Sequence, residues 1–512
     1  MAGKTTAVPT SVSGLQHDTR CLLWWALASR LLLLTLIILW RSLLSSYDTS
    51  SALNPPCLST ISAGSSNPCP NPPSVLLPRV GSAIENSIVW DSVHFLRIAE
   101  CGYEYEHSYA FLPLLPICIR LFSNAVFAPL VPLIGYRAVL GLSGYLISNT
   151  AFIFAALYMH RLSIIVLKDP EVALRASILF SLNPASIFYS SIYSESLYAL
   201  LSFGGLYHFL NGAGYNATFW LALSGFARSN GVLNAGYFCL NAMQRAYKAF
   251  SWDKNAFLAL KILVSGALSC LCILAPFICF QVYGYFNICA GRSVDEMRPW
   301  CKARLPLLYN YIQSHYWGVG FLRYFQVKQF PNFLLASPIL SLALQAIIYY
   351  MKLWPNVFIT LGIQAPLSRK ELAGTALALG SKDIPRKSCF SESSSSTLQD
   401  DDALRLRRKA IKGETLVMKP LESEALFNLP SIPVVIVPFV VHLSFMVATA
   451  FFVMHVQVAT RFLSSSPVLY WFASHIMGSP GVGKKWGYFI WSYCVAYILL
   501  GSLLFSNFYP FT

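Results

Sequence analysis

Long apolar runs recur along the whole chain and constrain its fold more than any other feature. The first, residues 21–44, has enough apolar residues to cross a bilayer, and its only charges are Arg30 and Arg41. Hydrophobic residues form 55% of the 512-residue chain and charged residues only 12%, which lies outside the range of ordinary soluble proteins. The sequence therefore predicts an all-α polytopic membrane protein.

Roughly nine to eleven membrane segments are expected from these runs. Prolines interrupt residues 109–133, so we expect that segment to lie partly in the interface or to re-enter. Asn183-Pro184 is a helix-boundary signal, and residues 183–196 should break the apolar pair 176–192 and 197–210. The remaining runs are 138–159, 219–243, 256–286, 333–350, 433–454 and 486–505, with shorter ones around Val357 and Val468.

The basic residues predict the orientation of the chain. Its net charge of +15, from 37 basic and 22 acidic side chains, is typical of cytoplasmic loops beside anionic head groups. Lys4 and Arg20 favour a cytoplasmic amino terminus over residues 1–20. A cleaved signal peptide competes with the first apolar run, but the run is long and no small-residue cleavage site follows it. We therefore interpret it as an uncleaved anchor.

The chain divides into a membrane core and one polar insert. The core is predicted over residues 21–366, with a luminal catalytic loop at about residues 45–135 that begins as an irregular Ser-, Pro- and Asn-rich segment. Residues 367–426 change abruptly to Ser-rich and charged blocks, which predicts a disordered cytoplasmic insert. Residues 427–512 are expected to complete the core with the last membrane segments.

The stretch at residues 90–116 is the candidate active site, because ionisable groups gather there beside apolar sequence. Asp91 and His94 lie three residues apart, so they share one face if the segment is helical. Glu106 and His107 follow closely. We predict all four as catalytic residues. A solvated loop between two membrane helices is the alternative interpretation.

Aromatic residues interleave with these groups, as they do in pockets that bind a sugar or a lipid head group. Trp90 and Tyr105 are the candidates for substrate binding. A carboxylate just outside a membrane suits a general base that acts on a hydroxyl while a phosphate leaves from a lipid donor, and Asp91 is the best candidate. The alternative is that Asp91 caps the helix that follows it.

Further candidate substrate ligands lie within or next to apolar segments, where an ionisable group is costly and usually paired or functional. Glu195 is expected to orient a hydroxyl and Arg228 to hold a phosphate, although a buried pair between them is equally compatible. His455, Gln457 and Arg461 stand at the end of a predicted span, where Arg461 either binds the donor phosphate or snorkels to the interface. We favour Arg461 as the phosphate ligand, because a partner such as Glu195 would occupy the donors of Arg228.

The 13 cysteines include no CxxC pair and no Cys/His cluster at metal-ligand spacing, so neither a metal site nor a redox motif is indicated. Cys57 with Cys69, and Cys289 with Cys301, are candidate disulfides if their loops face an oxidising lumen. Residues 478–484, GSPGVGK, match the phosphate-loop spacing but lack the following Ser or Thr that would hold magnesium. We interpret them as a loop.

Several short blocks resemble one family in the same order. WDSVHF at residues 90–95 and YEHSYAFLPLLP at 105–116 are similar to the signature of glycosylphosphatidylinositol (GPI) mannosyltransferase II, the PIG-V family. The further similar blocks are NPASIF at 183–188, YSESLYAL at 193–200, ARSNG at 227–231, RPWC at 298–301, YIQ with YWGVGFLRYF at 311–325 and HVQVATRFL at 455–463. The chain departs from the family at Leu112, where Phe is usual, and in its long polar insert.

The resemblance implies a multi-pass endoplasmic-reticulum enzyme of the GT-C glycosyltransferase fold with luminal loop helices. Such an enzyme transfers the second mannose, in α-1,6 linkage, from dolichyl-phosphate mannose to the GPI precursor. The donor is β-linked and the product α-linked, so the reaction is an inversion that needs one base and a stabilised leaving phosphate. Asp91 matches the acidic position of the family's first luminal loop.

A membrane transporter or lipid-handling protein is the rival class that many spans would also allow. It would show paired half-repeats and polar sites at the midplane, whereas the polar blocks here cluster at helix ends on one side. Nucleic acid is not an expected partner, because no compact basic reading domain is present. The sequence leaves open the metal dependence and whether a small accessory membrane subunit takes part.

Overall fold

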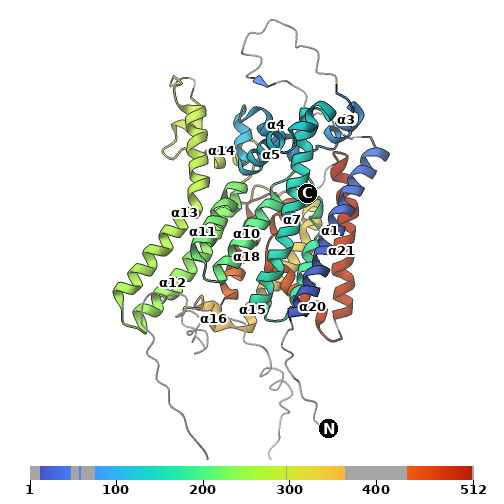
Figure 1. Cartoon of the computed structure of the whole chain (residues 1–512). Helices are drawn as coiled ribbons and strands as arrows, with labels where there is room; N and C mark the ends of the chain where they lie inside the picture. Colours follow the sequence, from blue (N-terminus) through green and yellow to red (C-terminus); the bar gives the residue numbers. More distant parts are fainter. Residues whose placement is uncertain are drawn as a thin grey trace, which may run out of the picture. The chain divides into compact units, whose positions relative to one another are not determined.

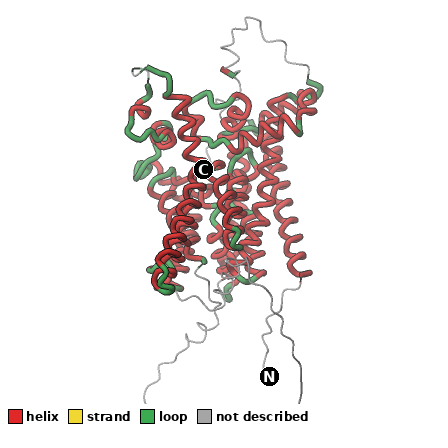
Figure 2. Tube along the Cα trace, turned by 60° about the vertical axis from the view of Figure 1, so that its left-hand side comes forward, coloured by secondary structure: helices red, strands yellow, loops and turns green. Residues whose placement is uncertain are grey.

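Residues 1–365 and 433–512 belong to one compact unit of the chain. A computed structural model describes residues 12–45, 47, 57–58, 75–293, 295, 297–363, 435–481 and 483–509, all of which lie in this unit. The predicted insert, residues 367–426, therefore lies outside the described residues, as do residues 1–11 of the predicted amino-terminal tail. Figure 2 shows helix and loop but no strand in the described part of the chain, which confirms the all-α prediction.

Five helices among the described residues are long and apolar enough to cross a membrane, so the chain is a multi-pass membrane protein. They match the predicted runs at 21–44, 138–159, 256–286, 333–350 and 486–505. The elements that contain them are α1 (Val12–Leu43), α7 (Tyr136–Leu167), α13 (Ala256–Cys289), η5 (Val327–Gln329) with α15 (Phe330–Leu353), and α21 (Gly483–Ser506).

Shorter helices pack among these five. They are α8 (Pro170–Ser181), α10 (Glu195–Leu210), α11 (Gly214–Ala227), α12 (Ala235–Ser251), α18 (Ile436–Phe452) and α20 (Pro467–Gly478). Helix α10 lies against α7 and α11, and α12 lies against α13 (Figure 1). The predicted number of roughly nine to eleven segments is reached only if these shorter helices are counted with the long ones.

Three interruptions shape the bundle, and two of them were predicted. Helix α5 (Leu114–Ala125) and the helical segment Ala128–Ile134, which comprises η2 (Ala128–Leu130) and α6 (Val131–Ile134), are bent by 70°, as the prolines at residues 109–133 indicated. Between α8 and α10 only the short α9 (Ser186–Ser190) is helical, which confirms the predicted break at residues 183–196.

The third interruption corrects the sequence analysis, because the apolar run 219–243 is not one helix. It is divided by η3 (Ser229–Asn234), and Arg228 before it is extended. A Cβ at Gly231 would lie 2.3 Å from the carbonyl of Ser224, so glycine allows this close approach. The Asn234 amide donates to the hydroxyls of Ser202 and Ser224 at 3.1 and 2.9 Å, which stabilises the turn.

The loop helices α3 (Pro78–Asn86), α4 (Asp91–Cys101) and α14 (Leu308–His315) lie at one end of this unit, in the upper part of Figure 1. Helices α12, α20 and α16 (Pro355–Ile359) lie at the opposite end. The predicted luminal loop at about residues 45–135 therefore contains a helix that begins at Pro78, where proline is favoured in the first turn. The remaining short elements are η1 (Glu106–Ala110), η4 (Pro299–Lys302), η6 (Val456–Val458) and α19 (Ala459–Leu463).

A buried cation joins the first helix to the broken segment. Arg30 of α1 is 1% exposed and lies over the ring of Phe152 at 3.8 Å. Its Nη1 donates to the Ser186 carbonyl at 3.1 Å and to the Ser190 hydroxyl at 2.9 Å. Its Nη2 donates to the carbonyl of Ser181 at 3.4 Å, and this carbonyl at the end of α8 has no helical partner. Arg30 thereby fixes α9, which directly precedes Tyr193 and Glu195.

Candidate active site

One cavity of about 430 Å³ gathers most of the predicted site residues. They come from four separated segments of the chain: the start of α4, the start of α10, the turn between α11 and α12, and the loop after α18. Seven of the residues predicted from the sequence line it, namely Trp90, Asp91, Glu195, Arg228, His455, Gln457 and Arg461. The stretch 90–116 is thus part of a cavity wall and not only a solvated loop.

Asp91 is the first residue of α4, and its backbone N–H donates to the hydroxyl of Tyr193 at 3.1 Å. Its carboxylate Oδ2 accepts from Nη1 of Arg461 at 3.0 Å, and the side chain remains 37% exposed. The alternative of a helix cap is wrong, because Trp90 occupies the cap position and no side chain caps this helix. Trp90 is held by its indole N–H, which donates to the Phe505 carbonyl at 3.1 Å.

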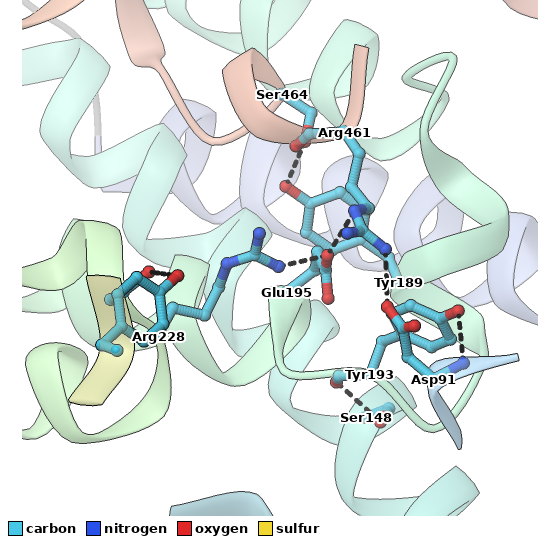
Figure 3. Close-up of polar contacts among 10 residues, drawn as sticks. Asp91, Ser148, Tyr189, Tyr193, Glu195, Arg228, Arg461 and Ser464 are labelled. Carbon is cyan, nitrogen blue, oxygen red and sulfur yellow. Dashed lines mark hydrogen bonds and ion pairs between the residues drawn. The ribbon is translucent and has the colours of Figure 1, made fainter. Parts of the chain in front are cut away.

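Glu195 joins two arginines beside Asp91. Its Oε1 lies 3.2 Å from Nε of Arg461 and forms a second ion pair with Nη1 of Arg228. Figure 3 shows the Arg461 guanidinium between the carboxylates of Asp91 and Glu195, with Arg228 reaching Glu195 from the other side. We call Asp91, Glu195, Arg228 and Arg461 the cavity cluster. The predicted pair of Glu195 with Arg228 is present, but both residues also line the cavity.

The segment after α18 is fixed by aromatic and amide contacts. The Tyr324 hydroxyl donates to Oε1 of Gln457 and accepts from the Asn332 amide at 2.8 Å. His455 stacks on the Tyr324 ring with centroids 4.6 Å apart. Arg461 of α19 faces Asp91 and Glu195, so the alternative that it snorkels to the interface is wrong.

Glu106, His94, His107 and Tyr105 are not among the residues that line this cavity. Glu106 accepts from the Trp300 indole N–H at 2.6 Å and from the Tyr316 hydroxyl at 2.7 Å. Nε of Arg298 lies 3.6 Å from the same carboxylate. Burial, together with the hydrogen bond to Glu106, raises the pKa of Tyr316 to about 12. We call Glu106, Arg298, Trp300 and Tyr316 the wall cluster.

His94 and His107 stack on aromatic residues beside the cavity. His94 lies flat on Phe111, a cavity-lining residue, at 4.7 Å, and edge-on to His107 at 5.5 Å. Tyr105 stacks on His107 at 5.6 Å. Burial lowers the pKa of both imidazoles, so the neutral form is favoured. Their predicted role in catalysis stays a prediction. In the structure His94 packs on Phe111, and His107 packs on Tyr316 of the wall cluster.

The cavity also contains residues that the sequence analysis did not single out. They include Phe188, Tyr193, Asn230, Tyr309, Gln313 and Trp317. All six lie inside or next to the blocks NPASIF, YSES, ARSNG, YIQ and YWG, so their position beside those blocks was the available signal. They could not be predicted as site residues from their type, because aromatic and amide side chains are uncharged and are common outside binding sites.

Two disulfides brace the loops around the site. Cys289 pairs with Cys301, as predicted, and joins the end of α13 to η4, which carries Trp300. The predicted pair of Cys57 with Cys69 is wrong, because Cys57 is bonded to Cys101 at the end of α4. Cys69 lies outside the described residues. Local spacing favoured the nearer cysteine, whereas the fold brings residue 57 to one that is 44 positions away.

The fold and the site define a multi-pass membrane protein in which carboxylates and arginines converge on one cavity at the end of the bundle. The family model described as Mannosyltransferase (PIG-V) matches residues 19–512, and the chain belongs to this family. Family membership confirms the resemblance drawn from the short blocks. It also decides between an enzyme and a transporter in favour of the enzyme.

Several curated relatives agree with this assignment. The chain is 32% identical over 410 residues to GPI alpha-1,6-mannosyltransferase 2 of Mus musculus, covering 76% of this chain and 72% of the relative. It is 34% identical over 410 residues to the Cricetulus griseus protein of that name, with the same shares covered. GPI mannosyltransferase 2 of Drosophila pseudoobscura pseudoobscura is 31% identical over 453 residues, covering 83% of this chain and 86% of the relative. No solved structure matches the chain.

Proposed function

We propose that this protein is an α-1,6-mannosyltransferase that adds the second mannose to the GPI-anchor precursor, with dolichyl-phosphate mannose as the donor. The observation that carries the proposal is the carboxylate of Asp91, which pairs with Arg461 in a cavity that Arg228 also lines. Family membership and the names of the relatives support the reaction type.

In this mechanism Asp91 is the general base. Its Oδ2 is held by Arg461, and among the described residues no side chain is hydrogen-bonded to Oδ1. Oδ1 accepts the proton of the acceptor mannose hydroxyl as that oxygen attacks the anomeric carbon of the donor. The bond from this carbon to the phosphate oxygen breaks on the opposite face, and dolichyl phosphate leaves with the electron pair. One inversion converts the β-linked donor into an α-linked product.

The leaving phosphate needs a cation, and the structure changes the basis for choosing it. Arg461 was favoured because Arg228 would be occupied by Glu195, yet Glu195 pairs with both arginines. Arg461 has Asp91 as an additional partner, whereas Glu195 is the only carboxylate that pairs with Arg228 among the described residues. Arg228 therefore has more donors available, and we propose Arg228 as the phosphate ligand and Arg461 as the residue that orients Asp91.

We place the cavity on the luminal side of the endoplasmic reticulum. The start of α1 and the end of α16 lie at the end of the bundle opposite α4 (Figure 1). Cytoplasmic positions for residues 1–20 and for the insert at residues 367–426 would leave residues 90–116 in the lumen. The disulfides at Cys57–Cys101 and Cys289–Cys301 suit an oxidising compartment. On this proposal the two membrane parts, residues 21–366 and 427–512, form one catalytic core.

The test is a transfer assay in microsomes that carry this protein and lack any other enzyme for this step. They receive dolichyl-phosphate mannose and a one-mannose GPI precursor, and the lipid products are separated. A two-mannose product whose new linkage is cleaved by an α-1,6-specific mannosidase is the expected result. Absence of that product with a well-expressed protein, or a product made equally well without dolichyl-phosphate mannose, would contradict the proposal.

A further inference from the structure

A second cleft, also of about 430 Å³, lies between α4, α5, α11 and α13. Its lining is mainly apolar and includes Ile98, Pro116, Ile117, Phe226, Phe280 and Tyr283. Pro113 in its wall directly follows Phe111 and Leu112, which line the active-site cavity. The two hollows are therefore neighbours along the chain, but no residue lines both.

One cation lines this cleft, and it has no counter-ion among the described residues. Arg120 of α5 is exposed and takes part in no ion pair there. Two other arginines of the same loop region are paired, Arg97 with Glu104 at 2.7 Å and Arg137 with Glu100 at 3.0 Å. An apolar cleft with one available guanidinium complements a ligand with a hydrocarbon chain and an anionic group.

The cleft is lined in part by a helix whose exposed apolar surface is expected to contact lipid. Helix α13 is a candidate membrane span, and only 6% of its most apolar part is buried. Tyr283 on this helix is 50% exposed, and Ile117 on α5 is 43% exposed. A lipid in the bilayer can therefore reach the cleft laterally, with its chain against α13 and its phosphate beside Arg120.

The distance from the proposed base distinguishes the two lipid substrates. Ile98 and Ala99 of the cleft follow Asp91 by seven and eight residues on α4, which is about 10–12 Å along a helix axis. The donor phosphate is bonded to the reacting sugar carbon, so it must lie beside Asp91. The acceptor is a glycosylated phosphatidylinositol, whose phosphate is separated from the reacting mannose by the intervening part of the glycan.

We propose that this cleft binds the phosphatidylinositol part of the acceptor lipid, with Arg120 contacting its phosphate. The inference rests on the proposed function, because that function supplies the identity of the acceptor. On this assignment the acceptor is anchored in the second cleft and extends its glycan past Phe111 into the active-site cavity. Arg120 is a specificity-determining residue that distinguishes phosphoinositide lipids from neutral lipids.

Photolabelling tests the site without relying on catalysis. The purified full-length protein is labelled with a phosphatidylinositol that carries a diazirine on one acyl chain, and the labelled peptides are identified. We expect label on α5 and α13, reduced about three- to tenfold in Arg120→Gln and unchanged in Arg79→Gln, an exposed arginine of α3 outside the cleft. Ile117→Trp fills the cleft but keeps the charge, so it should also reduce labelling.

Competing lipids then separate the occupants. Unlabelled phosphatidylinositol should displace the probe better than diacylglycerol or a polyprenyl phosphate. Equal displacement by diacylglycerol would overturn the role of Arg120, and stronger displacement by the polyprenyl phosphate would assign the cleft to the donor instead. Equal labelling of the wild type and of both cleft variants would overturn the site itself.

Kinetics in the transfer assay give the second readout. Arg120→Gln should raise KM for the GPI precursor about three- to tenfold while kcat and the KM for the donor stay unchanged, and Arg120→Lys should recover part of the loss. A variant that merely distorts the fold would change kcat and both KM values. If the wild type transfers no mannose, the proposed function fails, and the labelling result still decides the lipid site.

Discussion

The cavity cluster and the wall cluster each pair carboxylate with arginine, but they differ in what their carboxylate oxygens contact. In the wall cluster both carboxylate oxygens of Glu106 accept hydrogen bonds, from Trp300 and Tyr316. In the cavity cluster Asp91 uses Oδ2 for Arg461 and remains 37% exposed. A carboxylate with a remaining acceptor can take a proton from a substrate, whereas a fully engaged one stabilises the fold.

The comparison shows why residue type did not separate the two roles. Asp91 and Glu106 lie 15 positions apart in the same loop, each near aromatics and a histidine. What separates them is tertiary: Glu106 contacts a tryptophan 194 positions away, while Asp91 contacts an arginine 370 positions away that itself lines the cavity. The following substitutions test whether the two clusters are as distinct as their contacts indicate.

The largest effect on stability is expected for Glu195→Gln. Glu195 is 3% exposed and is the shared partner of Arg228 and Arg461, so its neutralisation leaves Arg228 without a carboxylate partner among the described residues and Arg461 with Asp91 alone. We expect a loss of about 3–5 kcal/mol in the free energy of unfolding, measured by thermal denaturation in detergent. The control is Glu171→Gln, whose side chain is 81% exposed in its pair with Arg175 and should lose less than about 1 kcal/mol. Equal losses of stability in Glu195→Gln and Glu171→Gln would show that the buried carboxylate stabilises the fold no more than an exposed one.

The next effect concerns donor binding. Arg228→Lys keeps the charge but loses the planar fork, so the apparent affinity for dolichyl-phosphate mannose should weaken by about 1.5–3 kcal/mol. Arg461→Lys should instead lower turnover, because Arg461 holds Asp91. Arg137→Lys, outside the cavity, is the matched control. If donor affinity is weaker in Arg461→Lys and unchanged in Arg228→Lys, Arg461 and not Arg228 is the phosphate ligand.

A smaller effect is expected in the wall cluster. Trp300→Phe removes the indole N–H that donates to Glu106 at 2.6 Å, which should cost about 1–2 kcal/mol of stability. Mannose transfer per folded molecule should change little. A large fall in transfer with normal thermal stability would show that the wall cluster takes part in the reaction.

The smallest effect is a pH dependence of stability. Burial lowers the pKa of His94 and His107 below the ordinary value of 6.5, so the unfolded chain binds protons more readily than the folded one. The free energy of unfolding is therefore unaffected by these two groups above pH 6.5. It decreases as the pH falls from there to the folded-state pKa, by at most about 1.4 kcal/mol per pH unit for each group. Melting temperatures from pH 7.5 down to pH 5.5 should fall less in His94→Phe than in the wild type. Parallel curves would contradict this assignment.

Most of the architecture could be predicted from the sequence, because a bilayer requires long apolar helices and their composition is visible locally. The prolines at residues 109–133 likewise predicted the bend after α5, and Asn183-Pro184 predicted the break between α8 and α10. The break at Arg228 was missed because the surrounding run is apolar. At this break Arg228 pairs with Glu195, and Gly231 lies close to the Ser224 carbonyl.

The members of the cavity cluster could be nominated from the sequence, but their partners could not. Charge within an apolar context pointed to Asp91, Glu195, Arg228 and Arg461 individually. That one carboxylate serves two arginines, and that Cys57 bonds Cys101, depends on contacts between distant segments. Spacing along the chain carries no information on such contacts.

The most direct test of the central claim compares Asp91→Asn with Glu106→Gln in the same transfer assay. Both substitutions replace a carboxylate by its amide in one loop, and each keeps the shape of the side chain. We expect Asp91→Asn to lower turnover per folded molecule by about 100-fold or more at normal melting temperature. Glu106→Gln should lower the melting temperature while turnover stays within about threefold. Near-normal turnover in Asp91→Asn, or an equal loss in Glu106→Gln at normal stability, would contradict the assignment of Asp91 as the base.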